Sequence, residues 1–355
     1  SIQVTATKGE LSVQGTTDGN GKVDIELSAF GVWTFTATID GESVSRNIAI
    51  YTSQFYTLTL SAVNVFGVSW DTTNPSPQLT RLTPENDPNG IVTVAITEEP
   101  VAAVGTGSGS SPFDNYLPWS GMEQYNIVDG AVSYKRGDPG FSQTEYDTMV
   151  YIPPFYYRRE MSGNNQLFYV SDKQFEGVQL HPGSGKYISR YPVSQNNKSV
   201  SGGAITNQTT YDSVRSYASG KTGTWWLFDG PAISAIQILY LIEFADLYSQ
   251  NLIGFGCGSS PISTTGATDI MIYHTGRVSG DVSQNSQVQY RWIEQPYANF
   301  VQCIDGMAKD ENGVLYICNT PSNYSSSITE NYESTGIEQP GGVDFSTGLS
   351  LVDGY

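Results

Sequence analysis

Apolar and polar residues alternate in short runs over the first part of the chain. Every second position is apolar in segments such as Ile2–Ala6 and Val23–Leu27, which is the period of a strand with one buried face. Glycine-containing turns such as Asp18–Gly21 separate these segments. The pattern predicts a small all-β sandwich over residues 1–62.

A helical period occurs mainly in one stretch of the second half. There, apolar residues recur at steps of three and four positions: Ile233, Ile236, Tyr240, Phe244 and Leu247. Pro231 follows Asp229, a good N-cap residue, so the helix is predicted to begin at this point. Further apolar residues cover most of the other faces, so we expect this helix to lie between layers of structure. The preceding pair, Trp225 and Trp226, is predicted to belong to a buried strand in the same core.

A second, shorter helix is predicted over residues 210–219, where Gly220 closes it. Nearly all of the remaining sequence has the pattern of strands and loops. Residues 63–149 include Asn-, Pro- and Thr-rich stretches and the flexible sequence GTGSGSS, so we interpret them as a lead-in segment and linker that pack on the next domain. Residues 150–355 are then the second domain.

The composition excludes several kinds of partner. The 355 residues include 17 Lys and Arg against 35 Asp and Glu, for a net charge of −18, which argues against nucleic acid or an anionic membrane surface as partner. The longest apolar run, from Ala232 to Phe244, contains Gln237 and is too short to span a bilayer, so we expect no membrane insertion. Abundant Tyr, Ser, Thr, Asn and Gly, with only 15 % charged residues, is typical of extracellular β-rich binding surfaces.

Several long segments resemble a known family. In order and spacing, the chain is similar to phage tail proteins and to diversity-generating-retroelement variable proteins of C-type lectin fold through VYIPPFYYRR, FYVSDKQFEGVQLHP, YISRYPVS, the helical stretch from Trp225 to Gly254 and YRWIEQPYANFVQCIDGM. Within that fold, it resembles most the branch shared with formylglycine-generating enzymes. The segment from Gly15 to Ile50 resembles the immunoglobulin-like modules of bacterial surface and phage structural proteins.

The resemblance implies an α+β chain. Its first domain is expected to be an immunoglobulin-like sandwich, and its second a C-type lectin-like domain with two helices and mostly antiparallel strands. The resemblance also implies a place in the virion, on a phage tail, or outside the cell on a bacterial surface. The N-terminal domain is expected to dock on phage structural proteins, and the second domain to bind a bacterial cell-surface receptor, protein or glycan, or another macromolecule.

The motifs of known catalytic sites are missing from the sequence. There is no GxSxG or HExxH, and the two histidines, His181 and His274, lie outside any motif. The resemblance to formylglycine-generating enzymes implies cysteine chemistry, but Cys257, Cys303 and Cys318 match no catalytic pattern. We therefore expect a non-enzymatic protein with buried cysteines, with one disulfide between Cys303 and Cys318 as an alternative, because both are predicted on pairing strands.

Calcium needs separate weighing because many lectin-fold proteins bind it. Asp310, Glu311 and Asn312 are adjacent and have the oxygen ligands that calcium prefers, yet they fall on a predicted hairpin turn and are interpreted as a solvated turn. Glu294–Pro296 and Glu338–Pro340, both Glu-Gln-Pro, only superficially resemble the sugar-binding tripeptides of calcium-dependent lectins. We predict no cofactor, with calcium as the alternative.

What remains is a surface rich in aromatic and amide side chains late in the chain. Such side chains give contact area and adaptable hydrogen bonds at low cost in conformational entropy. The predicted ligand-binding residues are Tyr290, Trp292, Tyr297, Asn299, Asn319, Asn323, Tyr324, Asn331 and Tyr332. For Tyr290 and Trp292 the pattern is equally compatible with a place in the core.

We therefore predict non-enzymatic ligand or receptor binding by a lectin-fold display surface, as in a phage receptor-binding or retroelement-diversified variable protein. Two alternatives stay open. One is an enzyme related to the formylglycine-generating oxidases. The other is a purely structural virion decoration protein.

Overall fold

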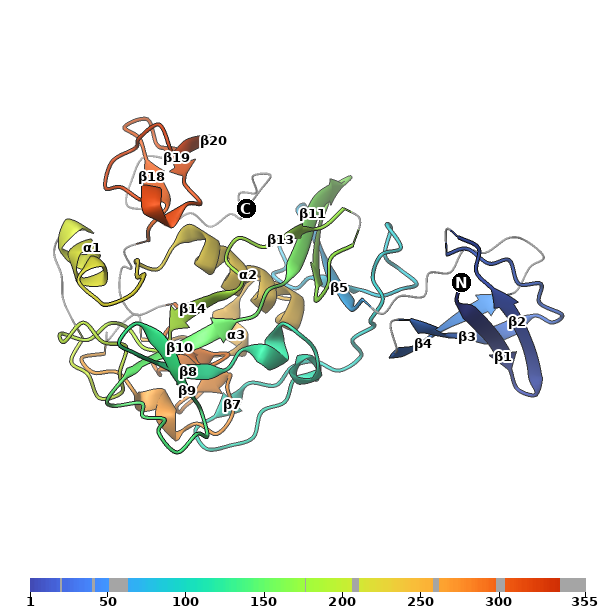
Figure 1. Cartoon of the computed structure of the whole chain (residues 1–355), viewed down its shortest axis with the longest axis horizontal. Helices are drawn as coiled ribbons and strands as arrows, with labels where there is room; N and C mark the ends of the chain where they lie inside the picture. Colours follow the sequence, from blue (N-terminus) through green and yellow to red (C-terminus); the bar gives the residue numbers. More distant parts are fainter. Residues whose placement is uncertain are drawn as a thin grey trace.

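The computed structural model describes residues 1–19, 21–39, 42–50, 63–175, 177–205, 211–257, 262–297 and 304–338. Within these ranges the chain is mostly β with few helices, and its sheets are antiparallel except for one short parallel pair. This agrees with the predicted α+β class. Figure 1 shows the N-terminal sheet beside a larger body that holds the helices.

The N-terminal region forms one four-stranded antiparallel sheet of order β2-β1-β3-β4. Its strands are β1 (Gln3–Lys8), β2 (Leu11–Thr16), β3 (Gly31–Ile39) and β4 (Glu42–Ile50). Trp33 is fully buried on one face, against Ala6 and Ile50. Ile25 and Leu27 pack against this cluster from an irregular segment, so the strand predicted over Val23–Leu27 is wrong. Residues 51–62, the end of the predicted sandwich, lie outside the described ranges.

The rest of the described chain contains four further sheets. The five-stranded sheet of order β13-β11-β12-β5-β6 comprises β5 (Val65–Asp71), β6 (Thr80–Leu82), β11 (Tyr156–Ser162), β12 (Asn165–Ser171) and β13 (Gln179–Leu180). The sheet of order β14-β10-β8-β9 comprises β8 (Gln124–Val128), β9 (Ala131–Lys135), β10 (Asp147–Ile152) and β14 (Lys186–Ser189). The sheet of order β17-β16-β15-β7 comprises β7 (Ala103–Val104), β15 (Gly276–Arg277), β16 (Val288–Tyr290) and β17 (Ile293–Glu294). The last sheet comprises β18 (Met307–Lys309), β19 (Val314–Ile317) and β20 (Glu333–Glu338).

Residues 63–149 are built into these sheets. β5 pairs with β12 from Val65 opposite Ser171 to Asp71 opposite Asn165, and β8 lies between β9 and β10. The segment therefore supplies interior strands, which is closer integration than that of a lead-in segment packed on a finished domain.

Helix α2 (Gly230–Phe244) runs through the main hydrophobic core. The Asp229 side chain accepts a hydrogen bond from the Ala232 N–H at 2.8 Å, and Pro231 lies in the first turn, which is the predicted start of the helix. Its buried side chains belong to the main core and contact β5 and β12. Helix α1 (Tyr211–Ser219) ends before Gly220, as predicted, and α3 (Ser249–Leu252) is a single further turn.

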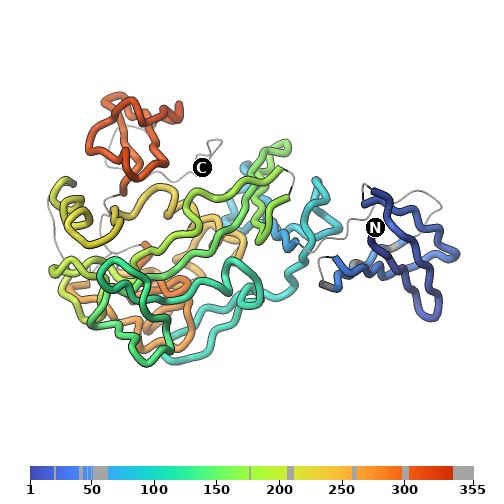
Figure 2. Tube along the Cα trace, viewed as in Figure 1, coloured from blue at the N-terminus to red at the C-terminus, as the bar shows by residue number. Residues whose placement is uncertain are grey.

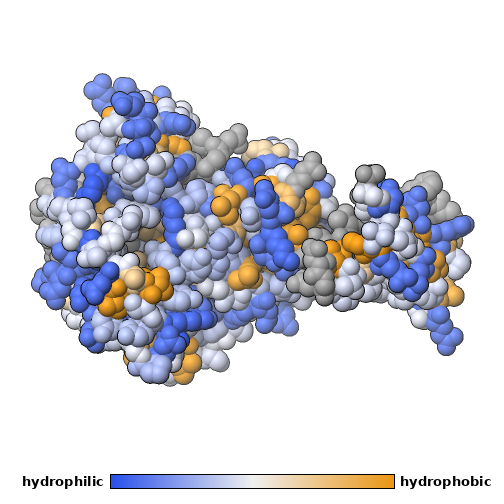
Figure 3. Space-filling view, in the orientation of Figure 1, coloured by the Kyte–Doolittle hydropathy of each residue, from blue (hydrophilic) through white to orange (hydrophobic). Residues whose placement is uncertain are grey.

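Short 3-10 helices complete the body: η1 (Pro112–Asn115), η2 (Trp119–Gly121), η3 (Ala267–Ile270) and η4 (Pro321–Asn323). Figure 2 shows the last described strands, in red, near α1, in yellow, and Arg215 of α1 donates to Ser326 in that last segment. In the described ranges, no helix has the length and apolar content needed to cross a bilayer. On the face in Figure 3, hydrophobic residues occur in small groups among polar ones.

Candidate functional site

A cleft of about 490 Å³ lies along the edge strand β14. The β14-β10-β8-β9 sheet contributes Asp147 and Tyr187 to its lining, and α1 and the segment that leads into α2 contribute further residues. Six aromatic side chains line the cleft: Tyr187, Tyr191, Tyr217, Trp225, Trp226 and Phe228. Clefts of this volume with aromatic walls are typical ligand sites.

The two tryptophans of the cleft are held through their indole nitrogens. Trp226 Nε1 donates to Asp229 Oδ2 at 3.0 Å, and Trp225 Nε1 donates to the Thr222 carbonyl oxygen at 2.9 Å. Both residues are half-buried and outside any strand, so the predicted buried strand is wrong. With each indole N–H already bonded, the ring faces provide the contact area.

Two pairs of opposite charges lie in the cleft wall. Lys186 Nζ is 3.3 Å from Asp229 Oδ2, and Lys221 Nζ is 2.7 Å from each carboxylate oxygen of Asp147. Lys221 Nζ also lies 4.2 Å from the centroid of the Trp225 ring, within reach of a cation–π interaction. These four residues together carry no net charge.

Glu294 and Gln295 line another side of the cleft, at the end of β17. Burial raises the pKa of Glu294, although hydrogen bonds from the Thr268 hydroxyl and from the Gly266 and Thr268 N–H groups oppose the rise. Gln295 has left-handed backbone (φ 52°), its Nε2 donates to Cys257 Sγ at 3.5 Å, and its Oε1 has no partner among the described residues. At this side of the cleft, Gln295 thus has both a strained backbone and a buried amide oxygen without a hydrogen bond from the described residues, and each of these costs free energy.

Hydrogen bonds hold the sheet β18-β19-β20 beside the cleft. Just before β18, the Asp305 N–H donates to the Phe228 carbonyl oxygen at 2.8 Å, and the Gly230 N–H donates to the Asp305 carbonyl oxygen at 2.9 Å. The Tyr324 hydroxyl donates to Asp229 Oδ2 at 2.9 Å. The last described strands are therefore attached to the residues that begin α2 and border the cleft.

The first group of predicted ligand-binding residues does not form an exposed face. Tyr290 is only 1 % exposed and its hydroxyl donates to Glu243 Oε2 at 2.9 Å, so the prediction for Tyr290 is wrong, because β16 lies against α2 in the core. Trp292 is half-buried beneath Arg136, whose guanidinium carbon is 3.9 Å from the ring centroid. The half-buried Tyr297 donates to the Gly254 carbonyl oxygen at 2.9 Å.

Asn299 lies outside the described residues. In the tail, Asn319 and Asn331 are exposed, whereas Asn323 and Tyr324 are half-buried. Tyr332 is only 6 % exposed, because its hydroxyl donates to the Ser325 carbonyl oxygen and accepts the Ser325 N–H. The prediction that Tyr332 is displayed is therefore wrong.

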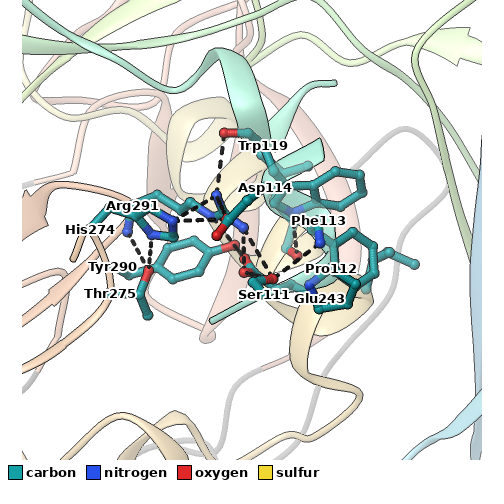
Figure 4. A network of polar contacts seen from close by, with 12 residues as sticks. Ser111, Pro112, Phe113, Asp114, Trp119, Glu243, His274, Thr275, Tyr290 and Arg291 are labelled. Carbon is teal, nitrogen blue, oxygen red and sulfur yellow. Dashed lines mark hydrogen bonds and ion pairs between the residues drawn. The ribbon is translucent and has the colours of Figure 1, made fainter. Parts of the chain in front are cut away.

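A second cluster of polar side chains lies inside the body, around the buried ion pair of Arg291 and Glu243 (Figure 4). Arg291 Nε donates to Glu243 Oε2 at 3.1 Å, and Arg291 Nη1 donates to Asp114 Oδ1 at 2.7 Å. The Tyr290 and Ser111 hydroxyls donate to the Glu243 carboxylate at 2.9 and 2.8 Å. We call these residues the Arg291 network.

The Arg291 network is closed to substrates. Arg291 and Glu243 are both buried, and the carboxylate and guanidinium satisfy each other's hydrogen bonds. The Glu243 charge raises the pKa of Arg291 against the opposing effect of burial. Burial also opposes ionisation of Asp114, but the hydrogen bond to His274 and the Arg291 charge outweigh it and lower the pKa of Asp114 to about 2. The network holds η1, α2 and β16 together through hydrogen bonds between charged side chains.

The remaining candidates from the sequence are placed as follows. His181 is buried, its ring stacks 4.8 Å from that of Phe155, and burial lowers its pKa to about 3. His181 Nδ1 accepts the Gly183 N–H at 3.1 Å, so the neutral ring carries its proton on Nε2. Cys257 and Cys318 are buried thiols, and Cys303 lies outside the described residues.

The proposed calcium residues form a turn. Asp310 Oδ1 accepts the N–H groups of Asn312 and Val314 at 2.9 and 2.8 Å. Within the described ranges, no group of three or more His, Cys, Asp or Glu side chains is placed to hold a metal ion. Of the two Glu-Gln-Pro tripeptides, Glu294–Pro296 lies at the cleft, but the Glu294 carboxylate is occupied by hydrogen bonds.

Comparison of the chain with protein-family models, with curated proteins and with solved structures gives no match. The assignment of the site therefore depends on its geometry. Sequence reasoning missed the cleft residues because they come from four separated segments. One signal was available: adjacent tryptophans after the Gly-rich sequence SGKTG, where a strand interior is a less natural setting than a loop.

Proposed function

We propose that this chain is a non-enzymatic binding protein whose ligand, a component of the bacterial surface, occupies the cleft beside β14. The observation that carries the proposal is the cleft itself, because aromatic side chains line it and its lysines are paired with carboxylates. Trp and Tyr provide large contact areas with few rotatable bonds, so binding costs little side-chain entropy. This proposal places the ligand site in the aromatic cleft instead of on the Tyr and Asn residues late in the chain.

In this proposal the second domain is of the C-type lectin-like kind and the N-terminal sheet is the immunoglobulin-like domain that docks on phage structural proteins. Support comes from a helix buried among mostly antiparallel sheets and from the separate N-terminal core around Trp33. The protein would act in the virion or at the bacterial surface. Binding, rather than decoration alone, is favoured because a purely structural role gives no reason for an open aromatic cleft.

The described residues offer no observation in favour of the oxidase. Cys257 is buried, and burial raises the pKa of its thiol, whereas reactive cysteines have lowered pKa values and partial exposure. We therefore put forward no second function.

Adsorption of the fluorescently labelled chain to a panel of bacterial cells tests the proposal. Trp225→Ala removes an indole that lines the cleft, and we expect it to weaken adsorption about tenfold, the loss typical of a central aromatic contact. Tyr248→Ala is the matched control, because Tyr248 is 57 % exposed and lies outside the cleft lining. Unchanged adsorption by a folded Trp225→Ala variant would refute this placement of the site.

A further inference from the structure

We infer that the cleft binds a neutral oligosaccharide chain and that tyrosines on the adjoining sheet face extend the site along that chain. The inference rests on the proposed function, since it names the ligand class for the same cleft. Two features of the molecule carry it. One is that both cleft lysines are paired with carboxylates while the Glu294 carboxylate is occupied by hydrogen bonds, and the other is an aromatic surface that continues beyond the cleft.

The paired charges favour an uncharged ligand. Lys186 and Lys221 are already neutralised by Asp229 and Asp147, at 3.3 and 2.7 Å. An anionic ligand would have to displace one of these carboxylates, and a cationic ligand one of these lysines, which leaves a partly buried charge without its partner. The net charge of −18 adds a general repulsion against anions.

Tyrosines continue the aromatic lining out of the cleft, and we call Tyr187, Tyr151 and Tyr125 the tyrosine cluster. Tyr187 on β14, Tyr151 on β10 and Tyr125 on β8 belong to successive strands. Ring centroids are 4.8 Å apart between Tyr187 and Tyr151, 5.6 Å between Tyr187 and Tyr125, and 6.3 Å between Tyr151 and Tyr125, so the three rings pack against one another. Tyr187 belongs to both the cleft and the cluster and is 37 % exposed.

The register places the tyrosine cluster on one face of the sheet. Tyr151 is opposite Tyr187, and Tyr125 is opposite Met149, which is two residues from Tyr151 and so points to the same side. Met149 and Tyr187 both line the cleft. The cleft and the tyrosine cluster are therefore continuous along this face.

The chemistry of this surface matches that of a sugar chain. A pyranose ring presents C–H groups on its faces and hydroxyls at its edge, so an aromatic ring can cover the face while polar groups reach the edge. The phenol hydroxyls and the paired lysines and carboxylates provide those polar groups. Aromatic rings both inside the cleft and on the sheet face beside it suit a chain of sugars better than a single sugar.

Calorimetry with neutral glucose, mannose, galactose and N-acetylglucosamine oligomers, from disaccharide to hexasaccharide, tests the inference. We expect at least one series to bind, with affinity that rises with chain length. Tyr151→Ala should lower affinity for the hexasaccharide roughly fivefold, the loss of one aromatic contact, and leave the disaccharide almost unchanged. Tyr146→Ala is the control, because Tyr146 contacts only Tyr134 among the aromatic rings of the described residues and lies outside the cleft lining.

The outcomes separate this inference from the proposed function. If Trp225→Ala abolishes adsorption to cells but no neutral oligomer binds, or if only anionic glycans or peptides bind, the ligand class is wrong and the cleft remains the site. If oligomers bind with affinity independent of length, or if Tyr151→Ala weakens short and long oligomers equally, the extension of the site onto the tyrosine cluster is wrong. If Trp225→Ala changes neither oligomer binding nor adsorption, both proposals fail.

Discussion

The Arg291 network and the cleft beside β14 are built from the same kinds of side chain and differ in access. In the network, Arg291 and Glu243 are buried and each hydrogen-bonding group meets a protein partner. In the cleft, Lys221 and Asp147 also pair, but the aromatic rings beside them are half-exposed. Buried ion pairs hold segments in place, whereas paired charges beside open aromatic rings leave a neutral surface for a ligand.

This difference shows that charge and aromatic content alone do not identify a site. Both regions contain tyrosines and pair a cation with a carboxylate. What separates them is whether water and a ligand can reach the rings. The strongest tests of the comparison therefore change one region and measure both stability and binding.

The largest expected effect is on the network. Arg291→Met removes the cation and leaves the Glu243 carboxylate buried without its partner, so the free energy of unfolding should fall by about 3–5 kcal/mol. Urea unfolding followed by tryptophan fluorescence measures this loss. Arg158→Met is the matched control, because the Arg158–Glu160 pair is partly exposed and should change stability by less than about 1 kcal/mol. If Arg291→Met lost less stability than Arg158→Met, the proposed structural role of the network would be wrong.

An intermediate effect is expected from His181, which also lies in the closed interior. Burial lowers its pKa to about 3, below the ordinary value of about 6.5 in the unfolded chain. The unfolded state therefore takes up the proton first as the pH falls, and stability present above pH 6.5 is lost between about pH 6.5 and 3. Between pH 7 and 5 the loss should be about 2 kcal/mol.

Unfolding of the wild type and of His181→Gln at several pH values measures this dependence. The variant has no titrating group at this position, so its stability should vary less over the same window. If both proteins lost the same stability between pH 7 and 5, other groups would account for the dependence.

The smallest effect is expected from the cleft pair. The Lys221 and Asp147 side chains keep 19 % and 11 % of their surface exposed, more than the ion pair of the network, so Lys221→Met should lower the free energy of unfolding by about 1 kcal/mol. Its effect on binding should be larger than its effect on stability, because Asp147 then carries an unpaired charge in the cleft. Thermal unfolding and oligosaccharide calorimetry on the same variant give the two values. If Lys221→Met changed the free energies of unfolding and of binding equally, Lys221 would have a structural role like that of Arg291 and no separate role in the site.

The parts of the fold that depend on local sequence were predictable. The Asp229 cap, Pro231 and the apolar period fix the start of α2 within a few residues, and Gly220 follows α1. The hairpin turn at Asp310 was likewise readable from neighbouring residues. Each of these depends on interactions over a few positions, which the sequence shows directly.

The site was not predictable in the same way. Tyr290 and Tyr187 are both strand tyrosines, yet one donates to Glu243 inside the core and the other lines the cleft. Which of them is buried depends on whether α2 or the open edge of a sheet lies against it, and this is set by residues far away in sequence. The same is true of Tyr332, which is buried by its own loop through Ser325.

Asp229 makes hydrogen bonds to several separate parts of the molecule. Its carboxylate begins α2 through the Ala232 N–H, holds the Trp226 indole and Lys186 in the cleft, and receives the Tyr324 hydroxyl from the last segment. One fully buried side chain thus bonds to the helix, to the wall of the cleft and to the segment beside the C-terminal sheet. Because Lys186, Trp226 and Tyr324 share one oxygen of Asp229, we expect a ligand that shifts Lys186 or Trp226 to disturb the hydrogen bond from Tyr324, and so to couple the cleft to the C-terminal sheet.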